Sequence, residues 1–422
     1  MSTRRQVLAS LLFAGGAAAF GRRRGEAAGE ERSSSSTLQD SAIVSARPAV
    51  VTPNGASLPF VMKDGVKEFR LIAEPVEREF APGMKVKCWG YNGRTPGPTI
   101  EAVEGDRVRF LVANRLPEST SIHWHGIILP NGMDGVSGLN QREIRPGETY
   151  AYEFTLRQHG THMYHPHADE MLQMAVGMMG MFVIHPRQRE DPPVDREFAL
   201  MLHAFAVHPG TYRPDPSIMT EFNMFTFNSR VFPGTEPLVV RAGQRVRIRI
   251  GNLSMDEHPI HIHGHSFRVT GTDGGPVPKS AQWPETTVLV PVGSTRDMEF
   301  VADNPGDWAL HCHKSHHAMN AMGHGIPNVL GVDQSAVEKR IAELLPGYTA
   351  MGESGMAEHS AHAQHMPGPK NTLPMMRGRG PFGPLDMGGM FTVVKIRDGI
   401  TGYDDPGWYR HPPGTVAWRV QG

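Results

Sequence analysis

An internal repeat constrains the fold of this 422-residue chain more than any other feature of its sequence. The run GDRVRFLVAN at 105–114 resembles GQRVRIRIGN at 243–252, at an offset of 138 (243 minus 105). The same offset brings HWHG at 123–126 onto HIHG at 261–264. Further along, the triplets HPH and HCH correspond at an offset of 146 (311 minus 165). A glycine turn, a strand and histidine pairs that recur in one order predict two halves with the same fold.

Apolar residues in each copy alternate with other residues, as Val108, Phe110 and Val112 do in the first copy. This two-residue period is typical of an antiparallel strand with one buried face. The 47 glycines and 35 prolines, with short apolar runs between turn signals, also favour many short strands over long helices. The repeat therefore predicts an all-β protein built from two similar β-sandwiches.

We expect the two sandwiches at residues 51–190 and 191–335, followed by a C-terminal extension at 336–422. The part of the extension from 349 to 390 is rich in methionine, histidine, glycine and proline, and no regular structure is expected for it. The apolar run from Phe391 to Ile396 is expected to add a strand.

The N-terminal segment, 1–30, has the features of an export signal. Arg4 and Arg5 precede an apolar stretch from Leu11 to Phe20, which is the arrangement of a twin-arginine signal, although a disordered basic terminus would also fit. Residues 31–50 are expected to be a flexible linker. No other stretch approaches the roughly 18 apolar residues that span a bilayer. We therefore expect a protein exported to the periplasm or the extracellular space, without a membrane span.

Charge and cysteine content narrow the classes of function. The 42 lysines and arginines nearly balance the 43 aspartates and glutamates, and a net charge of −1 does not indicate binding to nucleic acid or to an anionic membrane. The two cysteines, Cys88 and Cys312, could form a disulfide, but the sequence around Cys312 favours a metal thiolate. Cys88 is then expected to be a small buried apolar residue.

Four His-x-His pairs are the strongest chemical signal in the chain. In a strand, residues i and i+2 project from the same face, so each pair presents two imidazoles to one point. A single pair would more often belong to an ordinary polar strand. Four pairs placed symmetrically in two repeats predict several transition-metal ions between the repeats, because neutral imidazole suits copper and zinc. The eight residues are His123, His125, His165, His167, His261, His263, His311 and His313.

Cys312 lies between the two histidines of the last pair, and strand alternation turns its side chain to the opposite face. The thiolate can therefore bind a different metal from its two neighbours. His317 follows five residues after Cys312, and Met322 follows five residues after that. A cysteine, a histidine and a methionine are three of the four ligands of a blue-copper site. The second histidine must come from another loop, and His258 is the candidate.

These stretches, together with residues 89–100, resemble the signature stretches of multicopper oxidases of the laccase type. The resemblance covers both halves and implies two cupredoxin-like Greek-key β-sandwich domains. It implies copper as the cofactor, with one type 1 ion, one type 2 ion and a type 3 pair, four per chain. The type 1 ligands implied are His258, Cys312, His317 and Met322. The type 2 ligands implied are His123 and His261, and the type 3 ligands are His125, His165, His167, His263, His311 and His313.

Only the second half carries the type 1 ligands. Thr120, Pro166, Met171 and Val176 of the first half stand at the repeat positions of His258, Cys312, His317 and Met322. The first half is therefore expected to contribute cluster ligands alone. Two-domain members of the family form homotrimers. By this resemblance, the three-copper cluster lies between the first domain of one subunit and the second domain of its neighbour.

The resemblance implies an oxidoreductase that takes electrons from a phenol, an aromatic amine or a metal ion and reduces dioxygen to water. Cys312 would carry electrons towards the cluster, and Asp134 would relay protons. Asp134 precedes a glycine, so a turn residue is an equally good interpretation. The methionine-rich and histidine-rich segment at 349–390 has thioethers that suit cuprous ion, which suggests a cuprous oxidase or copper-tolerance role. The alternatives are a two-domain copper nitrite reductase, which needs fewer histidines, and a non-catalytic copper-binding protein, which does not explain the ordered histidines.

Overall fold

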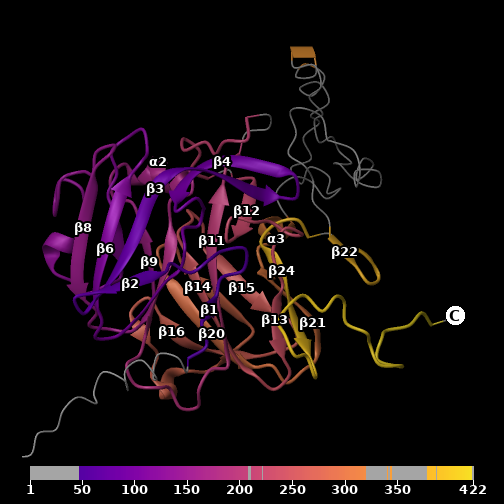
Figure 1. Ribbon diagram of the computed structural model, residues 1–422. Helices are drawn as coiled ribbons and strands as arrows, with labels where there is room; N and C mark the ends of the chain where they lie inside the picture. The colour runs from indigo at the N-terminus through magenta and orange to yellow at the C-terminus, as the bar shows by residue number, and fades with distance from the viewer. Residues whose placement is uncertain are drawn as a thin grey trace, which may run out of the picture. The chain divides into compact units, whose positions relative to one another are not determined.

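The computed structural model consists mainly of β-strands and connecting loops (Figure 1). The predicted all-β fold class is confirmed. The helices that the structure describes from end to end are short: η1 (Asn131–Met133), α2 (Glu170–Ala175), η2 (Lys279–Ala281) and α3 (Ser315–Met319). The predicted export signal, Met322 and most of the methionine-rich and histidine-rich segment lie outside the described residues. The structure describes residues 47–207, 211–220, 222–319, 340, 343–344, 378–385 and 387–420.

The first half of the chain forms two sheets. One has the order β2-β3-β6-β8, with β4 paired to β3, and the other has the order β5-β10-β9-β7. The strands of the first sheet are β2 (Phe60–Lys63), β3 (Val66–Ala81), β4 (Met84–Tyr91), β6 (Arg107–Asn114) and β8 (Thr149–Thr155). The strands of the second sheet are β5 (Ile100–Val103), β7 (His123–His125), β9 (Gly160–His165) and β10 (Gly180–His185).

Two further sheets are built mainly from the second half, and a small hairpin precedes the last strand of the chain. The larger has the order β1-β11-β14-β20-β16-β17, with β12 on β11 and β18 on β16, and the other has the order β13-β24-β21-β15-β19. The larger sheet contains β1 (Val50–Val51), β11 (Arg196–Phe205), β12 (Met224–Phe227), β14 (Arg245–Asn252), β16 (Phe267–Thr272), β17 (Gly275–Pro276), β18 (Pro284–Glu285) and β20 (Thr295–Val301). The smaller sheet contains β13 (Leu238–Arg241), β15 (His258–Ile262), β19 (Thr287–Val290), β21 (Gly306–Cys312) and β24 (Phe391–Arg397). The hairpin is β22 (Gly378–Gly380) and β23 (Gly383–Leu385).

The strand expected from Phe391 to Ile396 is present as β24, and it lies inside the sheet between β13 and β21. It pairs in parallel with β13 and antiparallel with β21. A strand from beyond residue 335 is thus part of the sheet that carries the second set of histidines. The residue limits of the two domains stay a prediction.

The strands of the two halves correspond at the offsets of the sequence repeat. β6 begins at Arg107 and β14 at Arg245, which is the offset of the two glycine-strand runs. β9 begins at Gly160 and β21 at Gly306, which is the offset of the two triplets. β6 pairs in parallel with β3 and antiparallel with β8, as β14 does with β11 and β20. Since β7 pairs with β9 as β15 pairs with β21, both antiparallel, the histidine pairs lie on equivalent strands of two halves that share one topology.

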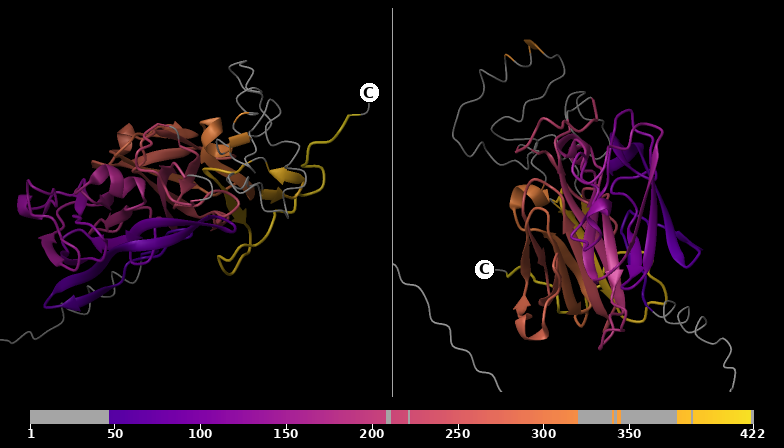
Figure 2. Two further views of the ribbon diagram at one scale, coloured as in Figure 1. Left: turned by 90° about the horizontal axis from the view of Figure 1, so that it is seen from above. Right: turned by 90° about the vertical axis from the view of Figure 1, so that its left-hand side faces the viewer.

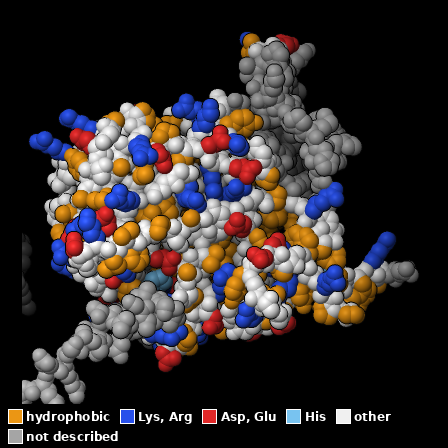
Figure 3. All heavy atoms as spheres, in the orientation of Figure 1, with side chains coloured by type: hydrophobic (Ala, Val, Ile, Leu, Met, Phe, Trp, Pro, Cys, Tyr) orange, Lys and Arg blue, Asp and Glu red, His pale blue; other side chains and the backbone are white. Residues whose placement is uncertain are grey.

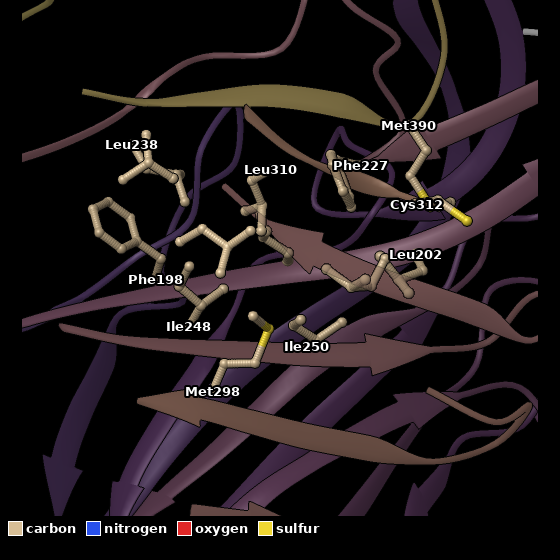
Figure 4. Packing of buried hydrophobic residues seen from close by; sticks show 14 of the residues in the cluster. Phe198, Leu202, Phe227, Leu238, Ile248, Ile250, Met298, Leu310, Cys312 and Met390 are labelled. Atoms are coloured by element: carbon tan, nitrogen blue, oxygen red, sulfur yellow. The ribbon is translucent and has the colours of Figure 1, made fainter. Parts of the chain in front are cut away.

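Each half encloses its own apolar core. Val108, Phe110 and Val112 of β6 are fully buried in the first core, and Ile248 and Ile250 of β14 are fully buried in the second (Figure 4). Alternate residues of both strands face inward, as the two-residue period predicts. Full burial of one such side chain stabilises the fold by about 1.5–3 kcal/mol. The two cores fix the sheets on which the histidines lie.

The two halves are joined where β9 packs against β14 and β20, and Figure 2 shows magenta strands of the first half beside orange strands of the second. Arg249 of β14 is buried at this contact. Its guanidinium donates to the Glu197 carboxylate at 2.7 Å, to the Thr161 hydroxyl of β9 at 2.8 Å and to the Asp297 carboxylate of β20 at 3.1 Å. This network ties β9, which ends at His165, to the second half.

One face of the molecule is mixed in charge. Lysine and arginine side chains lie among acidic ones on the face drawn in Figure 3, as the net charge of −1 leads one to expect. Exposed pairs such as Lys85 with Glu77, at 3.0 Å, contribute little to stability. No helix within the described ranges is long and apolar enough to cross a membrane.

Candidate metal centres

Three predicted ligands of the second half meet in one buried cluster. His258 begins β15, Cys312 ends β21, and His317 lies in α3. The Nδ1 atoms of the two histidines are 3.0 Å apart, and Cys312 Sγ lies 3.7 Å from Nδ1 of His258 and 3.5 Å from Nδ1 of His317. The three residues are at most 1 % exposed. Two nitrogens and one sulfur therefore converge on a single point that water does not reach.

Burial sets the protonation of this cluster. Burial lowers the pKa of His258 to about 3, and burial with the nearby His258 lowers the pKa of His317 to about 2. Both imidazoles are therefore neutral at neutral pH, with lone pairs available to a metal. Burial raises the pKa of the Cys312 thiol to about 12. A metal ion that binds there must displace the thiol proton, as metal binding at cysteine generally does.

Neighbouring side chains orient the two rings. His258 Nε2 hydrogen-bonds to the Ser254 hydroxyl at 2.8 Å, which turns Nδ1 of that ring towards Cys312. The His317 ring stacks on Phe225, with centroids 3.9 Å apart and planes 16° from parallel. A neutral, buried set of two imidazoles and one thiol is the trigonal donor set that suits copper in blue-copper sites. Met322, the fourth ligand expected from the sequence, lies outside the described residues.

The four predicted histidines of the first half also come together. The register of β7 and β9 pairs His123 directly with His165. Nδ1 of His125 lies 3.2 Å from Nε2 of His165, and the ring centroids of His123 and His167 are 5.7 Å apart. Donor atoms of His123, His125 and His165 all lie within 4.8 Å of one another, so these three residues could hold a metal ion.

Backbone carbonyls fix two of these rings. His123 Nδ1 lies 2.9 Å from the carbonyl oxygen of Asp134, and His165 Nδ1 lies 2.9 Å from that of Pro166. Carbonyl oxygens only accept, so each Nδ1 carries the proton and each Nε2 keeps its lone pair for a metal. Burial lowers the pKa of His165 to about 3 and keeps the ring neutral.

The four predicted histidines of the second half form a matching set. Nε2 of His263 lies 3.1 Å from Nε2 of His311, and the ring centroids of His261 and His313 are 5.3 Å apart. His261 Nδ1 donates to the carbonyl of Thr286 at 2.7 Å, which leaves its Nε2 for a metal. His263 and His313 are exposed. This set is more open than its counterpart in the first half, where His165 is buried.

The two sets stay separate within one chain. In the described part of the molecule, the ring contacts of each set join its own four members. Adjacent residues of β21 also take part in different groups. Cys312 contacts His258 and His317 in the core, whereas His311 contacts His261 and His263. The strand therefore connects two kinds of site one residue apart, as alternation predicts.

Asp134 follows η1 and lies beside the first histidine set. Its carboxylate oxygen Oδ1 is 3.5 Å from Nδ1 of His123, and its side chain is 31 % exposed. The following Gly135 has a φ of +88°, and an added Cβ would overlap the carbonyl oxygen of Ile122. Asp134 thus occupies a turn and also contacts a candidate ligand, so both interpretations of its role fit its position.

One further residue was expected from the sequence, Cys88, and two that contact the buried cluster were not, Ser254 and Phe225. Cys88 is buried and free, with 3 % exposure, as expected for a small apolar residue. Sequence reasoning missed Ser254 and Phe225, which orient the rings of His258 and His317. Ser254 lies only four residues before His258, but a serine in a turn carries no specific signal. Phe225 lies on β12, and nothing in the sequence links it to α3.

Comparisons with known proteins fit this geometry. Two family models, both described as multicopper oxidase, match residues 73–189 and 208–329, which together exceed half of the chain. The chain belongs to the multicopper oxidase family. Membership implies copper as the cofactor and an oxidoreductase class of activity, and the converging histidines and cysteine suit that metal.

Similar proteins differ in length and name. This multicopper oxidase is 49 % identical to copper resistance protein A of Escherichia coli over 111 residues, which cover 26 % of this chain and 18 % of that protein. It is 30 % identical over 274 residues to a probable nitrite reductase-hydroxylamine oxidoreductase fusion protein of Kuenenia stuttgartiensis, covering 62 % of this chain and 31 % of the relative. The chain thus spans less than a third of the length of these curated relatives. The solved structure of multicopper oxidase mgLAC matches with a TM-score of 0.59 and 26 % identity, covering 81 % of this chain and 91 % of that one.

Proposed function

We propose that this protein is a laccase-like oxidase that takes electrons from a small reducing substrate at a type 1 copper and reduces dioxygen to water at a three-copper cluster. The observation that carries the proposal is that adjacent residues at the end of β21 belong to two different groups of candidate ligands. Cys312 contacts the buried pair His258 and His317, while the flanking histidines belong to the open set. Such a strand separates the uptake of single electrons from the site where several are needed.

The buried cluster and the two histidine sets would hold different copper ions. His258, Cys312 and His317 would hold the type 1 ion. The coppers, when bound, supply one-electron transfer at one site and multi-electron reduction of dioxygen at the other. His123 and His261 would hold the type 2 ion, and His125, His165, His167, His263, His311 and His313 would hold the type 3 pair, giving four coppers per chain.

The chain itself contributes orientation, exclusion of water and proton handling. The apolar core around Cys312 keeps the buried cluster dry, which strengthens electrostatic interactions there. The Nδ1–H groups of His123 and His165 donate to backbone carbonyls and hold those rings with Nε2 free, so the ligands are oriented before a metal arrives. Asp134 is partly exposed and lies 3.5 Å from His123, a position that suits a proton relay.

A conservative substitution tests the proton relay. Asp134→Asn keeps the turn and the backbone carbonyl that accepts from His123, but it removes the proton-accepting carboxylate. We expect copper content to stay at the wild-type level while dioxygen consumption falls about 10²-fold or more, the usual contribution of a positioned acid or base. Asp64→Asn, at another Asp-Gly turn, is the matched control. Full turnover of Asp134→Asn would leave the turn as the only role of this residue.

The separation of the two histidine sets supports a cluster shared between subunits. We propose a homotrimer in which the first half of one subunit meets the second half of its neighbour, a head-to-tail contact that closes into a ring. Co-expression of His125→Ala chains with His263→Ala chains tests this arrangement. Mixed trimers would contain interfaces with two intact sets and would regain oxidase activity that neither variant has alone. Sedimentation as an active monomer would contradict the proposal.

The substrate class includes phenols, aromatic amines and metal ions. The similarity to copper resistance protein A favours cuprous ion as one candidate, and the methionine-rich and histidine-rich segment would then serve copper handling or tolerance. Deleting residues 349–377, which end before β22, is expected to slow oxidation of cuprous ion and leave phenol oxidation unchanged. Equal kinetics with cuprous ion in the deleted and full-length proteins would remove this role.

A nitrite reductase is the second candidate, favoured by the name of the Kuenenia relative. A non-catalytic copper protein is a third. Oxygen uptake with a phenol, nitrite turnover and the number of coppers per chain separate the three. We expect oxygen uptake and four coppers, because eight histidines in two ordered sets exceed what a single type 2 ion needs. Export by the twin-arginine route, through residues 1–30, completes the proposal and is tested by changing Arg4 and Arg5 to lysine and locating the protein.

A further inference from the structure

Met390 lies directly opposite Cys312 where β21 and β24 meet. The antiparallel register pairs His311 with Phe391, so Cys312 and Met390 come next in the same register. The backbone N–H of Cys312 donates to the carbonyl of Met390 at 3.1 Å. Residues that face each other across an antiparallel pair project to the same side, with Cβ atoms about 4.5–5.5 Å apart. The Met390 side chain is therefore on the side of the sheet to which Cys312 points.

A second contact fixes Met390 against another candidate ligand. Its backbone N–H donates to the carbonyl of His317 at 2.9 Å, and the N–H of Gly389 donates to the carbonyl of Ala318 at 3.0 Å. The backbone of Met390 is thus held by two of the three residues that form the buried cluster. Its position relative to that cluster is set by hydrogen bonds on both sides.

The side chain of Met390 is fully buried in the same apolar cluster as Cys312 (Figure 4). A methionine sulfur lies two bonds beyond Cβ on a chain with three rotatable bonds, so from an opposing position it can reach the space beside Cys312 Sγ. The thioether is also the soft fourth donor that a site with two imidazoles and one thiolate takes in blue-copper proteins. The position, the burial and the donor chemistry of Met390 therefore all fit the fourth ligand of this site.

We infer that the thioether of Met390 is the axial ligand of the type 1 copper, in place of Met322. The inference rests on the proposed function, because it concerns the copper that this function requires. The type 1 site would then be built from three segments: β15 with His258, the end of β21 and α3 with Cys312 and His317, and the residue before β24. The spacing of Met322 from Cys312 then has no part in the coordination.

Four variants of the full-length, copper-loaded protein test the inference. A coordinating thioether stabilises the cupric state relative to a residue that cannot coordinate. Met390→Leu should therefore shift the balance towards cuprous copper by about tenfold or more, which is about 59 mV for one electron, and should change the type 1 absorption and electron paramagnetic resonance spectra. Met390→Gln should shift the balance the other way, because an amide oxygen is a harder donor. Met322→Leu and Met298→Leu, the latter a fully buried methionine of the same cluster, should leave potential and spectra at wild-type values.

The outcomes separate this inference from the proposed function. A shifted potential in Met322→Leu, or wild-type spectra in Met390→Leu, would overturn the inference while the blue copper itself remains. Absence of the blue absorption from the copper-loaded wild-type protein would overturn the proposed function as well. If the Met390 variants do not fold, Met322→Leu still decides, since a wild-type potential there excludes the competing ligand and a shifted one excludes Met390.

Discussion

Replacing Arg249 with methionine is expected to lower the free energy of unfolding by about 3–5 kcal/mol, the cost of removing one partner from a buried ion pair. The Arg249 side chain is 2 % exposed, and its partners Glu197 and Asp297 are 5 % and 8 % exposed. The hydrogen bond to the Thr161 hydroxyl, at 2.8 Å, would be lost, and so would two ion-paired hydrogen bonds to carboxylates, at 2.7 and 3.1 Å. At about 1.5–3 kcal/mol each, the latter two give a similar total. Methionine fills part of the volume, so the loss reflects two carboxylates left without their guanidinium.

Denaturant unfolding at matched protein and copper concentrations measures this cost, because bound metal and assembly also shift the transition. Arg70→Met is the control, since Arg70 is 77 % exposed and its contact with Glu68 is 3.5 Å long. It should change stability by about 0–1 kcal/mol. Adding Glu197→Gln to Arg249→Met should recover part of the loss, because the second change removes a buried carboxylate whose remaining partner is Arg247, at 3.7 Å. A loss below about 1 kcal/mol in Arg249→Met would refute the view that this network joins the two halves.

Three further predictions follow from the site and the network. Ser254→Ala should weaken type 1 copper binding by about 10- to 100-fold in chelator competition, since His258 loses the hydrogen bond that orients its ring. Gly135→Ala should cost about 1–3 kcal/mol and lower the copper content, because the new Cβ overlaps a backbone carbonyl, whereas Gly132→Ala meets no atom and should change neither. Burial raises the pKa of Glu197, but the nearby Arg249 and Arg247 lower it by a larger amount. The pKa in the folded state therefore lies below the unfolded value. The contribution of this carboxylate to the free energy of unfolding is present above pH about 4.3 and is lost as pH falls. The urea midpoint should therefore drop in acid, and Glu197→Gln should make the midpoint depend less on pH.

Much of the site could be predicted because its signals are local. The period of two along a strand places His311 and Cys312 on opposite faces, and their contacts agree with that expectation. The repeat locates equivalent histidine pairs in both halves without knowledge of the sheets. His258 could be proposed from its position three residues before a pair, and the structure brings it to Cys312.

Other features depend on contacts between distant segments and could not be predicted. The sequence indicates a strand at 391–396, but its place between β13 and β21 comes from pairings such as Leu238 with Val394. No local pattern specifies such a partner. The position of Met390 opposite Cys312 could not be predicted either. Spacing from Cys312 points to Met322, and only the pairing of β21 with β24 brings Met390 to Cys312. The stacking of Phe225 on His317 likewise requires the folded sheet.

The carbonyl of Ala318 accepts hydrogen bonds from the backbone N–H groups of Gly388 and Gly389, at 3.3 and 3.0 Å, so the chain returns at residue 388 to the point that it left at 318. Because these hydrogen bonds hold the two points together, the register of the strand that follows does not depend on how many residues lie between them. Evolution can therefore lengthen, shorten or exchange this region while the strand after it keeps its register. A domain inserted there is expected to leave the backbone hydrogen bond between Met390 and His317 in place.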